Sequence, residues 1–191
     1  VYLSLIADIN NLNELINKKD DKNINEFIKI ILESEKKYII ANRGMFCISH
    51  HFYFQIKNVV KNIFFLSDYD GGIFDNLNDI NNKDALIVIS FPRFSSLTIN
   101  FSKYAKKKGA KVISITNNLT SPLVKLSDVC LFCPHKGVSF FNSKVAAMAL
   151  LNAITSEIFN KNYDFAIKNM EREERILLDM KVLYMQRNKQ N

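Results

Sequence analysis

The side chains best suited to bind an anion gather in one segment, which reads Ser-Phe-Pro-Arg-Phe-Ser-Ser-Leu-Thr over residues 90–98. An apolar run precedes this segment and a helical pattern follows it at once, so we expect a helix to begin there. The free N–H groups and the positive dipole end of that helix would attract a phosphate. Arg93 adds a guanidinium that can clamp a phosphate through two hydrogen bonds. The hydroxyl groups of the predicted phosphate-binding loop come from Ser90, Ser95, Ser96 and Thr98.

A simpler interpretation of these serines stays open. Ser95 or Ser96 can be an N-cap that satisfies the first turn of the helix and binds nothing else. The turn Asn42-Arg43-Gly44 follows an earlier apolar run in the same way, and Thr116 ends a third run. If these runs are neighbouring parallel strands, the three loops meet at the carboxyl edge of a sheet, which is where such sheets bind ligands.

Five short apolar runs predict that sheet, and none of them alternates between polar and apolar residues: 38–41, 63–66, 86–89, 112–115 and 129–132. The pattern is typical of parallel strands buried on both faces. Helical patterns separate or follow the runs, at 45–60, 72–80, 96–108, 122–126, from Ala146 to Phe159 and from Asp164 to Arg187. We therefore predict an α/β fold, a five-stranded parallel sheet in an α/β/α sandwich with flavodoxin-like layering.

The same patterns divide the chain into a helical lead-in (1–35), an α/β domain (36–160) and a C-terminal helix (161–191). Gly109 follows three lysines, and we expect it to end a helix in the left-handed conformation. Helix 45–60 has an apolar surface too broad to cover one face of a sheet alone. A second copy should cover the rest, by symmetric pairing through this helix and the C-terminal helix. The result would be a dimer or tetramer.

The composition excludes several classes of protein. With 48% hydrophobic residues, 5 Gly and 3 Pro, the chain is neither disordered nor collagen-like. No run approaches the ~20 apolar residues of a membrane span, so we expect a cytoplasmic protein without a membrane partner. Three cysteines are too few and odd in number for a disulfide framework. The net charge of +7 fits either a solvated lysine surface or a positive cleft for a small anion.

Candidates for acid–base or metal chemistry are few, since residues 36–156 contain no Glu. His135 follows the fifth run at the ligand edge and is the best candidate for a base. His50 and His51 are adjacent in a predicted helix and cannot share a face. The string Cys130-Leu-Phe-Cys133 has no second pair to complete a zinc site, and its thiols should point to opposite faces of a strand. We expect no metal and no cofactor. The remaining candidate carboxylates are Asp68, Asp70, Asp75, Asp79, Asp84 and Asp128.

Together these loops resemble the sugar isomerase (SIS) domain. The string Ile-Ser-Phe-Pro-Arg-Phe-Ser-x-x-Thr, residues 89–98, is similar to the sensor domain of RpiR-type bacterial transcription regulators, and the polar segment 116–123 fits the same pattern. The resemblance covers about residues 25–160. The sequence departs from the family at two positions, where Phe46 replaces a serine and Leu97 an acidic residue.

The resemblance implies a phosphorylated sugar or amino sugar at the carboxyl ends of the strands, with Ser95 and Thr98 holding the phosphate, in a domain that forms dimers or tetramers. We expect the effector half of an RpiR-type regulator, which reaches DNA only through a domain absent from this chain. Residues 1–35 carry four Lys against seven acidic residues and show no basic recognition helix. The alternatives are a phosphosugar isomerase, with His135 as its base, and an oligomerisation module without a ligand.

Overall fold

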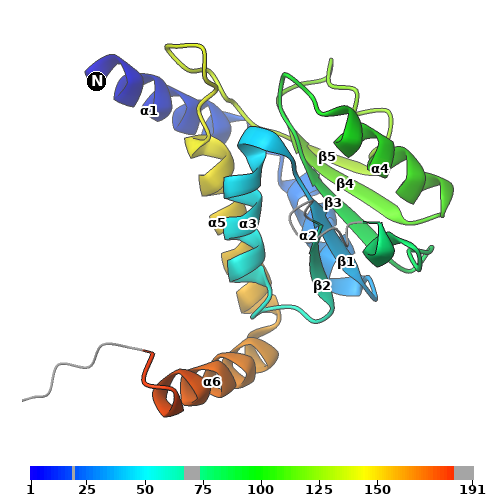
Figure 1. The fold of residues 1–191 in the computed structure, drawn as a ribbon. Helices are drawn as coiled ribbons and strands as arrows, with labels where there is room; N and C mark the ends of the chain where they lie inside the picture. Colours follow the sequence, from blue (N-terminus) through cyan, green and yellow to red (C-terminus); the bar gives the residue numbers. More distant parts are fainter. Residues whose placement is uncertain (19, 67–73, 183–191) are drawn as a thin grey trace, which may run out of the picture.

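A five-stranded, all-parallel sheet forms the centre of the protein (Figure 1). The structure, a computed structural model, describes residues 1–18, 20–66 and 74–182. The five apolar runs form strands, as predicted: β1 (Lys37–Ile40), β2 (Ile63–Leu66), β3 (Ala85–Ile89), β4 (Lys111–Thr116) and β5 (Val129–Phe132). Their order in the sheet is β2-β1-β3-β4-β5. The chain therefore reverses its winding direction between β1 and β3, and the loops after these two strands flank the point where open α/β sheets bind ligands.

Helices cover both faces of the sheet, which confirms the predicted α/β/α layering (Figure 1). The helices are α1 (Tyr2–Asn17), α2 (Asp21–Glu33), α3 (Phe46–Ile56), α4 (Ser96–Lys107), α5 (Val145–Lys161) and α6 (Tyr163–Asp179), with short 3₁₀ helices η1 (Arg43–Met45) and η3 (Asp75–Leu77). Helices α2, α3 and α5 pack on one face, and α4 packs on the other. Helix α1 packs against α5, and α6 extends away from the sheet (Figure 1). In the described part of the chain, no helix is long and apolar enough to cross a membrane.

The two cores follow from the alternation of side chains along each strand. Ile87 and Ile89 of β3 join the core beneath α2, α3 and α5, whereas Leu86 and Val88 join the core beneath α4. Because every residue of β3 is buried, both faces of this central strand must be apolar. This explains why the predicted strands read as continuous apolar runs.

Three of the expected helices differ from the structure. The segment 122–126 forms turns and no helix, because it lies between β4 and β5 and is too short to repay the cost of starting one. Residues 74–80 contain only the 3₁₀ helix η3, and the start of the expected helix 72–80 lies outside the described residues. The last helix ends at Asp179, and residues 183–191 lie outside the described part.

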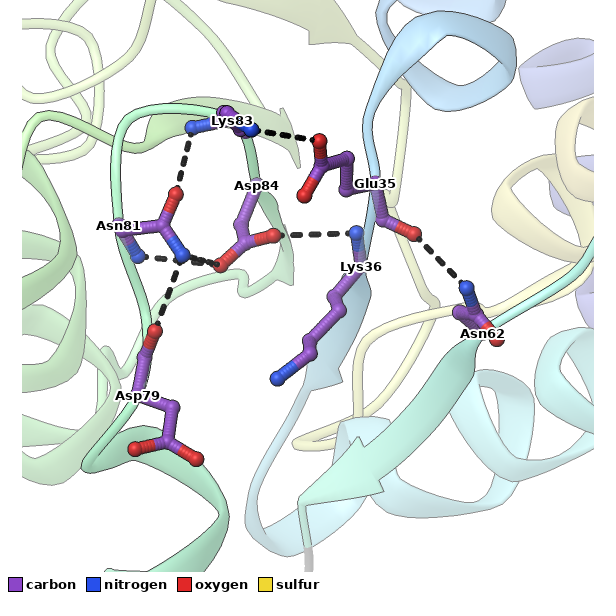
Figure 2. Close-up of polar contacts among 7 residues, drawn as sticks. All are labelled: Glu35, Lys36, Asn62, Asp79, Asn81, Lys83 and Asp84. Carbon is purple, nitrogen blue, oxygen red and sulfur yellow. Dashed lines mark hydrogen bonds and ion pairs between the residues drawn. The ribbon is translucent and has the colours of Figure 1, made fainter.

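Polar side chains fix the amino edge of the sheet (Figure 2). The buried Asp84 carboxylate accepts hydrogen bonds from the Lys36 N–H at 3.0 Å, and from the N–H and side-chain amide of Asn81 at 3.0 and 3.1 Å. These bonds join the segment before β1 to the turn before β3. Beside them, the buried Lys37 ammonium donates to the Lys61 carbonyl at 3.1 Å, and burial lowers its pKa. The two strands on which the ligand loops are mounted are thus anchored at their opposite ends.

Candidate functional site

A cavity of about 440 Å³ opens at the carboxyl edge of the sheet, beside the reversal point between β1 and β3. Three segments line it: 42–45 after β1, 90–95 after β3, and 140–144 before α5. Six of the nine residues predicted to bind the ligand lie in this lining, namely Asn42, Arg43, Gly44, Ser90, Arg93 and Ser95. The structure therefore brings together two loops that are about 50 residues apart in the sequence, as parallel packing of their strands requires.

Ser95 lies at the N-cap position of α4, with an extended backbone (φ −81°, ψ 127°). Its hydroxyl makes no capping hydrogen bond, so the simpler interpretation of this serine as a side-chain cap does not describe the structure. The hydroxyl is available to the cavity, and the first N–H groups of α4 follow it directly. Ser96 is exposed and does not line the cavity.

Thr98 and Thr116 are not among the described residues that line the cavity. Both are fully buried. The Thr98 hydroxyl accepts a hydrogen bond from the Asn42 side-chain amide at 3.0 Å and so ties the β1 turn to α4. The Thr116 hydroxyl donates to the Ser121 hydroxyl at 2.8 Å, and the Thr116 carbonyl accepts from the Cys133 N–H at 2.8 Å. In this structure both threonines hold the loops in place.

The third lining segment, 140–144, was not predicted from the sequence. The Asn142 side-chain amide donates to the Pro92 carbonyl at 2.6 Å and fixes this segment against the β3 loop. The Arg93 guanidinium lies 5.2 Å from the centre of the Phe140 ring, a cation–π contact. A polar run directly before a helix was the available signal. This polar run gave no information on where the segment lies relative to the cavity, because a long connection without regular structure separates it from β5.

The cavity is cationic. Its lining includes Arg43, Arg93 and Lys144, and no Asp, Glu or His occurs among the described lining residues. Arg43 adopts a positive φ of 56°, a conformation that favours glycine. An arginine nevertheless occupies this position, so the tight turn carries a guanidinium. Lys144 is half-buried. Clefts lined by one sign of charge concentrate ligands of the opposite sign, so this site is suited to an anion.

His135 does not line the cavity. Its ring centre lies 5.5 Å from the ring centre of Phe91, a residue that does line the cavity. Burial lowers the pKa of His135, and the charge of Glu14 partly opposes this shift. The described cavity lining therefore contains no imidazole.

The candidate carboxylates do not reach the cavity either. Asp84 belongs to the amino edge, and Asp128 accepts from the Val112 N–H at 2.9 Å and pairs with Lys106 at 3.0 Å. These contacts lower the pKa of Asp128, although its partial burial opposes them. Asp75 and Asp79 lie in or beside η3, outside the cavity lining. Asp68 and Asp70 lie outside the described residues.

The structure shows what surrounds the cysteines and the two residues that depart from the family pattern, Phe46 and Leu97. The Cys130 thiol lies 3.1 Å from the Ser114 hydroxyl, whereas Cys133 is buried in the core beneath α5, where burial raises its pKa to about 12. No group of three His, Cys, Asp or Glu side chains within the described ranges could hold a metal ion. Phe46 packs against Phe65. Leu97 lines a separate cavity beside α4.

These features define a member of the SIS domain family, whose family model matches residues 30–156. The chain belongs to this family. An uncharacterized HTH-type transcriptional regulator of Haemophilus influenzae is 22% identical over 185 residues, which cover 92% of this chain and 62% of the regulator. The chain thus spans less than two thirds of that relative.

Two solved structures share the fold. The sugar isomerase domain of the RpiR transcription factor from Sphaerobacter thermophilus has a TM-score of 0.86 and 18% identity, covering 91% of this chain and 97% of that one. The Vibrio vulnificus NanR protein complexed with ManNAc-6P has a TM-score of 0.79 and 16% identity, covering 93% of this chain and 68% of that one. Both agree with the fold predicted from the loops.

Proposed function

We propose that this chain is the sugar-phosphate-binding effector domain of an RpiR-type transcriptional regulator, and that it reaches DNA through a further domain outside these residues. The observation that carries the proposal is the cationic cavity at the carboxyl edge of the sheet, built from the two loops whose sequences resemble this family. The fold shared with the RpiR sugar isomerase domain and with NanR, a protein solved with a phosphorylated sugar, supports it.

The phosphate would bind at the β3 loop. Ser95 offers a hydroxyl that no cap uses, the amino end of α4 offers N–H groups and a positive dipole, and Arg93 offers a guanidinium. The hydrogen bond between Asn142 and Pro92 holds this loop before a ligand arrives. Such preorganisation lowers the entropic cost of binding.

The residues favour a sensor over an isomerase. An aldose–ketose isomerase needs a base within hydrogen-bond reach of the sugar carbons. The described lining of the cavity contains arginine, lysine, serine and asparagine side chains but no carboxylate or imidazole. His135, the base expected for an isomerase, is not part of this lining. Exchange of deuterium from solvent into a bound sugar phosphate would contradict this part of the proposal.

The direct test of the proposal is sugar-phosphate binding by wild type and Ser95→Ala. We expect glucose 6-phosphate or a related sugar phosphate at millimolar concentration to raise the melting temperature of the wild type. Ser95→Ala should weaken binding by about tenfold to a hundredfold, the effect of one hydrogen bond to a charged group. Its stability without ligand should be unchanged, because the hydroxyl caps nothing.

Ser156→Ala is the matched control, since Ser156 is an exposed serine on α5 outside the cavity. It should bind sugar phosphates like the wild type. If no sugar phosphate stabilises the wild type, the proposed function is wrong. If both variants bind equally well, the phosphate site is misplaced.

A further inference from the structure

We infer that the ligand of this cavity is a phosphorylated sugar that carries a second anionic group, either a carboxylate or a second phosphate, and that Lys144 and Arg43 bind this second group. The inference rests on the proposed function, because it assigns a further part of the same ligand. It starts from the arrangement of the three cations around the cavity.

The cations belong to two different sides of the cavity. Arg93 lies in the β3 loop beside Ser95 and the amino end of α4. Arg43 lies in the β1 turn, and the Lys144 side chain extends over the same turn, since its Cε would lie 3.8 Å from a Cβ built on Gly44. Two cationic side chains therefore lie at the β1 turn. The groups proposed to bind the phosphate, Ser95 and the amino end of α4, lie on the other side of the cavity.

The charge of a single phosphate does not account for this arrangement. A phosphate monoester carries about −1.5 to −2 near pH 7. Arg93 and the helix dipole, equivalent to about +0.5, supply nearly that much positive charge on the β3 side. Arg43, which is exposed, and Lys144, which is half-buried, then remain as two further positive charges beside the same cavity, and a second anionic group of the ligand would pair with them.

No protein group in the described ranges supplies that anion. None of the ion pairs found there involves Arg43 or Lys144. Asp8, which comes near through its bond to the Ser143 hydroxyl, is not part of the cavity lining. The lining itself contains no carboxylate. The positive φ of Arg43 adds a separate sign of function, because strained backbone conformations cluster at ligand sites.

The cavity can hold both anionic groups of one small ligand. Its volume of about 440 Å³ lies within the ~300–1,000 Å³ of typical small-molecule sites. The bond between Asn142 and the Pro92 carbonyl ties the segment that carries Lys144 to the loop that carries Arg93. The backbone segments that carry the two groups of cations are thus tied together, so both groups face one ligand in the same cavity.

The test compares singly and doubly anionic sugars by isothermal titration calorimetry with the full chain. The probes are glucose 6-phosphate and fructose 6-phosphate (one phosphate), 6-phosphogluconate (phosphate and carboxylate), fructose 1,6-bisphosphate (two phosphates) and gluconate (carboxylate alone). We expect at least one doubly anionic probe to bind about tenfold or more tighter than the singly anionic sugars, and gluconate to bind weakest. The carboxylate and bisphosphate probes distinguish the two possible second groups.

Lys144→Gln removes the second charge while keeping a polar side chain of similar reach. We expect it to abolish the preference for the doubly anionic probe, because it lowers the affinity for that probe more than the affinity for glucose 6-phosphate. Lys103→Gln is the matched control, because it removes the same charge from an exposed position on α4 outside the cavity. It should leave the preference intact.

The outcomes separate this inference from the proposed function. If glucose 6-phosphate binds as tightly as both doubly anionic probes, or if Lys144→Gln keeps the preference, the second anion site is wrong while sugar-phosphate binding stands. If none of the phosphorylated sugars binds the wild type, the proposed function fails and this inference falls with it.

Discussion

The surroundings of His135 predict that this residue makes the free energy of unfolding depend on pH. Its ring packs against Phe91, and burial lowers its pKa below the ordinary 6.5, partly opposed by Glu14. Between the lowered pKa and 6.5 the unfolded chain therefore binds more protons than the folded chain. The free energy of unfolding should fall as the pH falls through this window and should be fully retained above it.

Urea unfolding at about pH 7.5 and about pH 5.5 measures this effect. The wild type should lose more stability between the two values than His135→Gln, which has no titrating ring, and the difference between the two proteins isolates His135 from the carboxylates. The midpoint of the His135 ring proton in an NMR titration should lie below 6.5. A midpoint above 6.5, or equal losses in both proteins, would contradict the prediction.

The sequence indicates the cavity residues that directly follow a strand, and it fails where distance along the chain hides a contact. The turn at Arg43 and the loop at Arg93 could be placed because each comes immediately after an apolar run. Lys144 could not, since it lies 12 residues beyond the end of β5. Thr98 and Thr116 have the right chemistry and lie in the right loops, but the Asn42 and Ser121 side chains engage their hydroxyls. Only the structure reveals such partners.

The junction between α4 and β4 depends on one glycine. Gly109 has φ 83°, and a Cβ there would lie 3.1 Å from the Cβ of Asn82. Gly109→Ala combines an unfavourable backbone conformation with a tight contact. We expect it to lower the free energy of unfolding by about 1–2 kcal/mol, measured by urea denaturation.

Gly44→Ala is the matched control for this substitution. A Cβ at Gly44 meets only an ordinary contact with the Lys144 side chain at 3.8 Å, and its φ lies outside the left-handed region. Its stability should therefore stay close to that of the wild type. Equal losses in both variants would show that the left-handed cap does not determine the stability of this junction.

Strands were easier to predict than short helices, for a physical reason. A central parallel strand must be apolar on both faces, so β3 appears in the sequence as an uninterrupted apolar run. The dipeptide Ser121-Pro122 at the start of segment 122–126 is typical of a helix N-terminus. The segment nevertheless forms turns, because five residues make too few helical hydrogen bonds to offset the cost of starting a helix. The Ser121 hydroxyl accepts from the Leu123 N–H, as an N-cap would, and also from the Thr116 hydroxyl. Local signals thus mark where a helix can start but not whether it has room to form.

The exposed apolar surface of the whole molecule differs from the one expected. Most apolar side chains of α3 are covered, since Ile48, Phe52 and Ile56 are buried and α5 packs beside them. Helix α6 exposes four apolar side chains where it extends away from the sheet (Figure 1), namely Tyr163, Met170, Ile176 and Leu178. The larger exposed set lies on α1 and consists of Tyr2, Leu3, Leu5, Ile6, Ile9 and Ile16. Surfaces of this kind usually mark contacts between proteins.

We expect α1 to pair with a second copy of the chain, so that the wild type is a dimer or larger at micromolar concentration in light scattering. Ile6 and Ile9 are 53% and 56% exposed, and replacing both by Glu would place charges in an apolar contact. The double variant Ile6→Glu/Ile9→Glu should therefore be a monomer with unchanged helix content. Ile176→Glu, at a similarly exposed isoleucine of α6, should keep the assembly. If Ile176→Glu dissociates it and the α1 variant does not, the contact lies at the C-terminal helix, as the sequence pattern indicated, and a monomeric wild type would contradict both locations.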